Sequence, residues 1–123
     1  MTPQPQPRTR THLPRRTVSI IGTGSYLPGK ALTNAELEKM VGTPDHWVTR
    51  RPGIKERRIA ADGEFTRDLA ANAAKAAIEN AEISAEEIDL IIVASITPDM
   101  FMPSTACIVQ TKIGAKKAAC FDI

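Results

Sequence analysis

The residues with the clearest chemical potential stand together in the first half of the chain. Trp47 is the only tryptophan, and it is followed by Arg50, Arg51 and a dense cationic stretch at residues 55–58. An indole ring can stack on a purine, and a guanidinium can donate paired hydrogen bonds to a phosphate. The pattern indicates either a site for a planar, phosphorylated ligand or a tryptophan packed in a core beside solvated arginines. From spacing alone the packing interpretation is the simpler one.

Two cysteines are the only thiols in the chain. Cys107 falls in the first turn of an expected helix, where a helix N-terminus can lower the pKa of a thiol, but no general base stands nearby in the sequence. Burial as a small apolar side chain is therefore the better interpretation. Together with Cys120 it makes no disulfide framework, which favours a reducing cytosol. His12 and His46 are isolated, so no metal site is expected.

A glycine-rich stretch raises the question of a dinucleotide-binding loop. Gly22 and Gly24 end a short apolar run at residues 17–22, but Leu27 stands where such a loop has its third glycine. Residues 26–29 also intervene before any helix can begin. The stretch is therefore predicted to be a turn at the end of a strand.

The strands and helices that position these residues are predicted from local patterns in the sequence. The run at residues 90–94 is apolar and β-branched, and the Thr-Pro-Asp sequence at residues 97–99 favours the end of a strand. The run therefore predicts a strand that is buried on both faces of a parallel sheet.

Thr33 or Asn34 can cap the first helix, and Ser84 begins a capping box that leads into the central strand. The order strand, helix, strand implies that residues 17–22 pair in parallel with residues 90–94. The expected helices cover residues 35–41, a short stretch around Trp47, 67–80 and 106–113, and a last strand covers 118–123.

Composition places the chain among ordinary globular proteins. Its 123 residues are 42% hydrophobic and 24% charged, and the formal net charge is +2. That charge is too small to indicate a nucleic-acid or membrane partner, and no apolar run approaches the roughly 18 residues of a membrane span.

Residues 1–16 are rich in Pro, Gln, Thr and Arg and are predicted to be a disordered tail, whose prolines disfavour an organised basic face. Residues 17–123 are predicted to form one domain.

Five sequence blocks together resemble the N-terminal part of the β-ketoacyl-acyl-carrier-protein synthases III, which are condensing enzymes of the thiolase superfamily. The blocks follow the order of the family and cover nearly everything after the tail. They are IIGTGSYLP at residues 20–28, LTNAELEKMV at 32–41, HWVTRRPGIKERRIA at 46–60, DLAANAAKAAIENAEISAEEIDLIIVASITPD at 68–99 and PSTACIVQTKIGAKKAACFDI at 103–123.

The resemblance implies a partial thiolase-like α/β fold. Residues 17–123 would form an incomplete N-terminal half, with a mostly parallel buried sheet flanked by helices. The implied activity is an acyltransferase that condenses acyl-CoA, typically acetyl-CoA, with malonyl-acyl carrier protein to initiate fatty-acid synthesis. The family acts as a cytoplasmic homodimer without a tightly bound cofactor, and its partners are acyl-CoA and acyl carrier protein.

The resemblance also assigns ligand-binding residues. Trp47 matches the tryptophan that stacks on the adenine of CoA, and Arg51 matches the arginine that contacts the CoA phosphates. Thr43 matches a residue that lines the adenine site. Arg50 and Pro52 stand where threonine is common in the family. The resemblance thus raises the ligand-site interpretation above the packing interpretation.

No residue of the chain matches the catalytic residues of the family. The nucleophilic cysteine of the family follows the Phe-Asp strand, with the catalytic His and Asn later, so Cys107 and Cys120 do not match it. We therefore expect a fragment that does not condense substrates alone. The alternative is an inactive remnant that dimerises or binds CoA or acyl carrier protein. Met102 matches a residue that reaches the partner subunit's acyl pocket, where the family often has phenylalanine.

Overall fold

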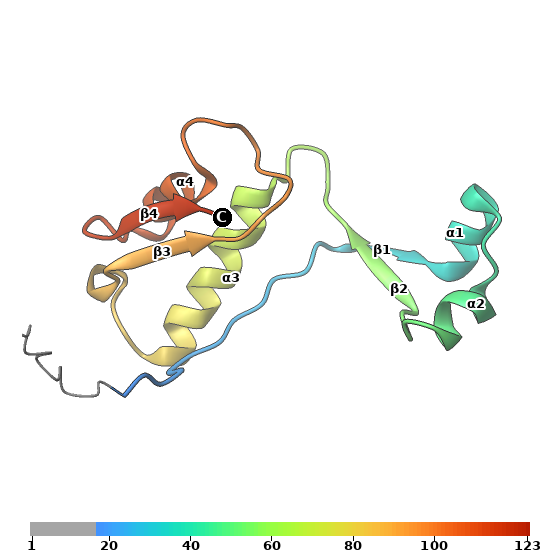
Figure 1. The fold of residues 1–123 in the computed structure, drawn as a ribbon, viewed down its shortest axis with the longest axis horizontal. Helices are drawn as coiled ribbons and strands as arrows, with labels where there is room; N and C mark the ends of the chain where they lie inside the picture. Colours follow the sequence, from blue (N-terminus) through green and yellow to red (C-terminus); the bar gives the residue numbers. More distant parts are fainter. Residues whose placement is uncertain (1–16) are drawn as a thin grey trace, which may run out of the picture.

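A computed structural model describes residues 17–123, so the predicted tail at residues 1–16 lies outside the described residues. The elements gather in two lobes, joined by the extended segment at residues 17–29 and by the connection at residues 60–65 (Figure 1). In chain order they are β1 Lys30–Thr33, α1 Asn34–Val41, α2 Asp45–Arg50, β2 Glu56–Ile59, α3 Thr66–Ala81, the short 3-10 helix η1 Ala85–Glu87, β3 Leu90–Val93, α4 Thr105–Ile113 and β4 Ala119–Asp122. Among residues 17–123, no helix has the length and apolar content needed to cross a bilayer.

The smaller lobe consists of β1, β2, α1 and α2, and its two strands pair in an antiparallel ladder. Thr33 ends β1 and caps α1. Its hydroxyl accepts a hydrogen bond from the Glu36 amide, and the Glu36 carboxylate accepts one from the Thr33 amide at 2.8 Å. Gly42 ends the helix with a φ of 65°, which glycine adopts without strain. The first predicted helix is therefore confirmed, with its start shifted by one residue.

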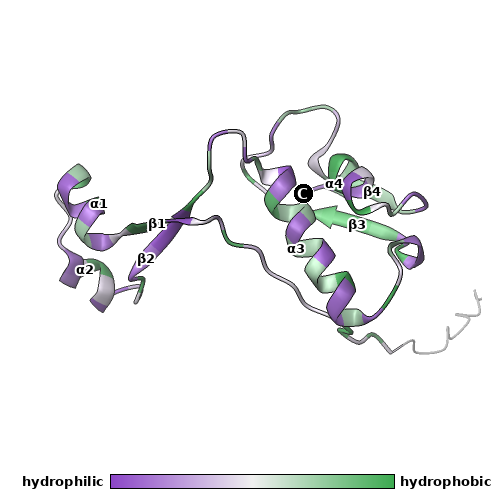
Figure 2. Ribbon diagram, turned by 180° about the vertical axis from the view of Figure 1, so that it is seen from behind, coloured by the Kyte–Doolittle hydropathy of each residue, from purple (hydrophilic) through white to green (hydrophobic). Residues whose placement is uncertain are grey.

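The larger lobe consists of β3 and β4, which pair in parallel, and of α3 and α4, which pack on each other and cover one side of the pair (Figure 1). Side chains alternate between exposed and half-buried along both strands. Leu90 and Ile92 are 49% exposed and Phe121 is 44% exposed on the uncovered face. Figure 2 shows this apolar character along β3. Among the described residues, the prediction that residues 90–94 are buried on both faces is therefore wrong, because helices cover one face only.

Residues 17–22 form no strand in the structure, which corrects the predicted first strand and its pairing with residues 90–94. A strand requires a neighbour that completes its ladder of backbone hydrogen bonds. This segment instead runs beside α3, where the Thr23 amide donates a hydrogen bond to Asn80 Oδ1 at 3.0 Å. The parallel pair of the structure joins β3 to β4 through α4.

Gly22 and Gly24 are the points at which this segment meets α3. A Cβ on Gly24 would lie 2.3 Å from the Ala77 nitrogen and 2.4 Å from the Ala73 carbonyl oxygen. A Cβ on Gly22 would lie 2.6 Å from the Ala77 carbonyl oxygen. The glycines therefore serve a close approach of two backbones, and the predicted turn is wrong.

The other expected elements are confirmed with small shifts. The helix around Trp47 is α2, and the expected capping box joins Ser84 to Glu87 at the start of η1. The long helix α3 begins at Thr66, since the Asp68 carboxylate accepts a hydrogen bond from the Phe65 amide.

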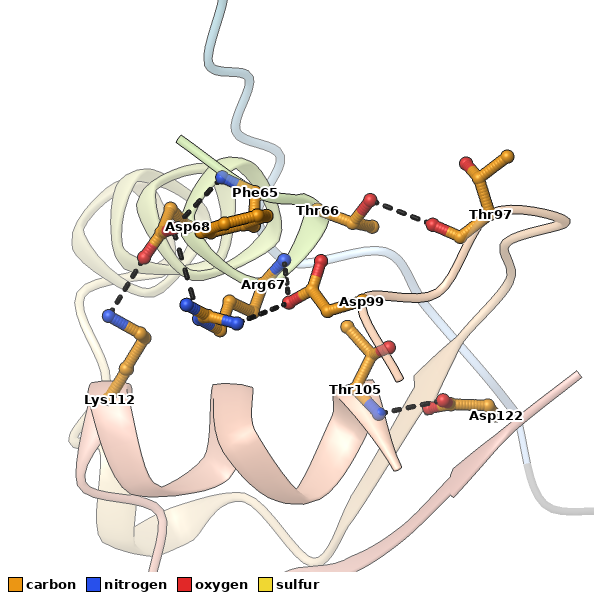
Figure 3. A network of polar contacts seen from close by, with 9 residues as sticks. All are labelled: Phe65, Thr66, Arg67, Asp68, Thr97, Asp99, Thr105, Lys112 and Asp122. Atoms are coloured by element: carbon orange, nitrogen blue, oxygen red, sulfur yellow. Dashed lines mark hydrogen bonds and ion pairs between the residues drawn. The ribbon is translucent and has the colours of Figure 1, made fainter. Parts of the chain in front are cut away.

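Ion pairs hold the start of α3 against the loop after β3 and against α4 (Figure 3). Arg67 Nη1 lies 3.2 Å from Asp99 Oδ2, and the Arg67 amide donates to the same oxygen. The Asp99 side chain is only 3% exposed. Lys112 Nζ lies 2.8 Å from Asp68 Oδ1, and this hydrogen bond lowers the pKa of Asp68. These contacts fix the two helices and the loop relative to one another.

Asp122, at the end of β4, binds the first turn of α4 (Figure 3). Its carboxylate accepts hydrogen bonds from the Thr105 amide at 2.7 Å and from the Ala106 amide at 2.8 Å. Thr105 and Ala106 are at most 1% exposed, so water does not reach these amides. Burial alone would raise the pKa of Asp122, but the hydrogen bonds from Ala106 and Thr105 outweigh it and lower the pKa.

Candidate functional site

The short helix α2 presents four side chains on one side. Its last residue is Arg50, and Arg51 continues directly from it. Residues three or four apart are neighbours on a helix, so positions 46, 47, 50 and 51 share one side. Val48 points into the lobe and is only 7% exposed, which fixes the rotation of the helix.

A hollow of about 360 Å³ lies on this side of α2 and is lined by His46, Trp47, Arg50 and Arg51. Arg51 Cζ lies over the Trp47 ring, 4.7 Å from its centroid, in a cation–π contact. Trp47 remains 47% exposed, so a ligand can reach the indole. Within residues 17–123, neither Arg50 nor Arg51 forms an ion pair. The structure therefore combines an accessible aromatic face with two guanidinium groups that can bind an anion.

The other two predicted site residues lie apart from this hollow. Thr43 is half-buried, two residues before α2 begins, and does not line the hollow. Met102 belongs to the loop between β3 and α4 in the larger lobe. It is 85% exposed, beside Phe101, which is 99% exposed. The roles predicted for Thr43 and Met102 stay predictions.

A buried amide contacts α2 and the chain segment that follows it. Asn34, the first residue of α1, is 3% exposed. Its Nδ2 lies 2.7 Å from Asp45 Oδ1, 2.8 Å from the Ile54 carbonyl oxygen and 3.3 Å from Thr49 Oγ1. Its Oδ1 accepts a hydrogen bond from Arg57 Nη1 at 2.9 Å. The hydrogen bonds from Asn34 and Thr49 lower the pKa of Asp45, so the acceptor of this amide is a carboxylate at neutral pH.

Sequence reasoning missed two contributors to this site. His46 is isolated with respect to metal-ligand spacing, but its spacing of four from Arg50 on a helix places the two residues on the same side. The sequence indicates Asn34 only as a possible helix cap. Its partners stand 11 to 23 residues away in the chain, so no local pattern indicates them.

Both cysteines belong to the larger lobe, Cys107 to α4 and Cys120 to β4. Cys107 and Cys120 are free, half-buried thiols. Burial, and to a smaller extent the neighbouring Cys107, raises the pKa of the Cys120 thiol. A raised pKa is the opposite of what a thiolate nucleophile requires, so Cys120 is a packed thiol rather than a nucleophile.

Comparison with known proteins identifies relatives of this chain. No family model matches the sequence. The β-ketoacyl-[acyl-carrier-protein] synthase III of Caldanaerobacter subterraneus subsp. tengcongensis is 62% identical over 104 residues, which cover 85% of this chain and 31% of the relative. The synthase III of Thiobacillus denitrificans is 62% identical over 95 residues, covering 77% of this chain and 30% of the relative. Over most of its length the chain matches part of β-ketoacyl-acyl-carrier-protein synthase III. It spans about 31% of the length of the first of these relatives.

Solved structures agree with this synthase III assignment. The 3-oxoacyl-[acyl-carrier-protein] synthase III from Aquifex aeolicus VF5 matches with a TM-score of 0.79 and 55% identity, over 85% of this chain and 33% of that one. The priming β-ketosynthase of the R1128 polyketide pathway matches with a TM-score of 0.82 and 30% identity, over 93% of this chain and 34% of that one. The expected partial thiolase-like α/β fold is thus confirmed.

Proposed function

We propose that the protein containing these residues condenses acyl-CoA with malonyl-acyl carrier protein, and that it thereby initiates fatty-acid synthesis as a cytoplasmic homodimer. We assign no residue of this chain to the condensation step itself. The contribution of these residues is to bind the nucleotide end of CoA. Relatives that are 62% identical over most of the chain are β-ketoacyl-[acyl-carrier-protein] synthases III, which supports this proposal.

The observation that carries the binding assignment is the pairing of Arg51 with the half-exposed Trp47 ring. CoA ends in an adenine nucleotide with a 3′-phosphate and a diphosphate. The adenine ring can stack on the free area of the indole, which is worth about 1–3 kcal/mol in comparable sites. Arg51 and Arg50 can donate hydrogen bonds to the phosphate oxygens. Thr43 would then contact the adenine edge from the segment that precedes α2.

The loop that carries Met102 is proposed to contact a second subunit. Phe101 and Met102 are apolar and almost fully exposed. Ile96, in the same loop, is fully exposed. Exposed apolar side chains in one loop are typical of protein contacts. We propose that Met102 enters the acyl pocket of the partner subunit, where a flexible thioether can adapt to different acyl chains.

Trp47→Ala and Arg51→Ala test the binding assignment. Each change is expected to raise the Kd for CoA about tenfold, because each removes one half of the stacking and phosphate contacts. The measurement is calorimetric titration of CoA into the protein. Arg58→Ala is the matched control, since Arg58 pairs with Glu56 in the same lobe and does not line the hollow.

The outcomes separate the hypotheses. An unchanged Kd in Trp47→Ala would contradict the assignment of the hollow to CoA. CoA binding by a protein that gives no condensation product would favour the inactive remnant.

A further inference from the structure

We propose that Asn34 is a positioning residue for the hollow: its buried amide fixes both chain segments that flank Arg51, and so holds the guanidinium over the Trp47 ring. This inference rests on the proposed function, because the ligand used to test it is CoA. Asn34 itself does not line the hollow.

The hydrogen bonds of one amide reach both sides of Arg51. On one side, Nδ2 donates to Asp45, the first residue of α2, and approaches Thr49 one turn later. On the other side, the same nitrogen donates to the carbonyl oxygen of Ile54, three residues beyond Arg51. Arg51 thus sits in a segment whose two ends are tied to a single buried group.

The chemistry of the partners requires an amide at this position. A carboxylate acceptor and a carbonyl acceptor need a group with two N–H donors, and the Arg57 guanidinium needs an acceptor. Aspartate could satisfy Arg57 but would place a second carboxylate beside Asp45. An aliphatic side chain would leave both Asp45 Oδ1 and the Ile54 carbonyl oxygen without this donor.

The start of α1 does not depend on this side chain. Thr33 and Glu36 supply the capping box, and the Asn34 backbone amide donates to the Lys55 carbonyl oxygen at 3.3 Å. A change of the Asn34 side chain therefore alters the tie between segments while leaving the helix cap and this backbone bond in place.

The experiment measures CoA binding through the fluorescence of Trp47, the single tryptophan of the chain. Asn34→Asp is expected to raise the Kd about fivefold, since Asp45 loses its donor and gains a like charge. The double variant Asn34→Asp, Asp45→Asn exchanges the two groups and restores a hydrogen bond between them. The double variant is expected to recover part of the loss, to a Kd about twofold above the wild-type value, because an aspartate at position 34 still cannot donate to the Ile54 carbonyl oxygen. A merely weakened fold would not recover at all.

Two further variants keep the test decisive. Asn80→Asp makes the same chemical change on α3 in the other lobe and should leave the Kd unchanged. If Asn34→Asp does not fold, Asp45→Ala removes the partner at the start of α2 from an exposed position and should raise the Kd about threefold.

The results distinguish this inference from the proposed function. A wild-type protein that does not bind CoA contradicts the proposed function. A wild-type protein that binds CoA, with Asn34→Asp or Asp45→Ala binding equally well, overturns the positioning role. A loss in Asn34→Asp that the exchanged double variant does not reduce overturns it too.

Discussion

Gly24→Ala is expected to lower the free energy of unfolding by about 3 kcal/mol, the largest effect of the changes considered. The new methyl group would stand 2.3 Å from the Ala77 nitrogen and 2.4 Å from the Ala73 carbonyl oxygen. Both are backbone atoms in the middle of α3, so they cannot move aside as the end of a flexible side chain could. Relief requires the segment at residues 17–29 to separate from the helix.

Denaturant unfolding of the wild-type and Gly24→Ala proteins measures this effect. Gly29→Ala is the matched control, because it makes the same change in the same segment and a Cβ there meets nothing within 4 Å. It should alter the stability by less than about 0.5 kcal/mol. Equal stabilities for the two variants would show that the segment does not lie against α3.

Asp122→Ala is expected to cost about 2 kcal/mol of stability, the second-largest effect. The change removes the acceptor of two amides, those of Thr105 and Ala106, which are at most 1% exposed and cannot turn to water instead. Asp122→Asn keeps one acceptor oxygen and should cost roughly half as much. Thermal or denaturant unfolding of the three proteins at neutral pH tests this order, and an alanine variant as stable as wild type would contradict it.

The Asp122 carboxylate also makes the free energy of unfolding depend on pH, in a direction that follows from its lowered pKa. The folded-state pKa of Asp122 is lowered, so its stabilising effect is fully present above the unfolded pKa of about 3.9. The effect is lost as the pH falls from there through the folded-state pKa. The stability difference between wild type and Asp122→Asn should therefore be constant from about pH 5 to 7 and shrink below about pH 4. A difference that grows with acidification would contradict the lowered pKa.

Local signals in the sequence were sufficient for most elements. Thr33 and Glu36 are three residues apart, and their reciprocal hydrogen bonds begin α1 where the capping pattern predicts. Ser84 and Glu87 do the same at η1. Such motifs are readable because all of their partners lie within one turn of chain.

Features that depend on distant partners could not be predicted in the same way. Residues 17–22 have the composition of a strand, but pairing depends on which neighbour is present, and in the structure they lie beside α3. The apolar run of β3 indicated burial without telling how many of its faces are covered. The hydrogen bonds of Asn34 depend on the fold of the entire smaller lobe.

The candidate site was predicted in part. The spacing of four between Trp47 and Arg51 becomes a direct contact once α2 forms, and the structure brings the two together. Sequence alone could not choose between a packed and an exposed indole, since that depends on which side of α2 faces the lobe. Val48 takes the inward position, and Trp47 is left accessible.

The division into two lobes has a consequence for amide hydrogen exchange. Within the smaller lobe α1 packs on α2 and β1, and within the larger lobe α3 packs on α4, so each can open as a unit of its own (Figure 1). CoA held at Trp47 would add its binding free energy to the smaller unit alone. Exchange should then slow across α1, α2 and β2 on addition of CoA, while the amides of α3 and β3 keep their unliganded rates.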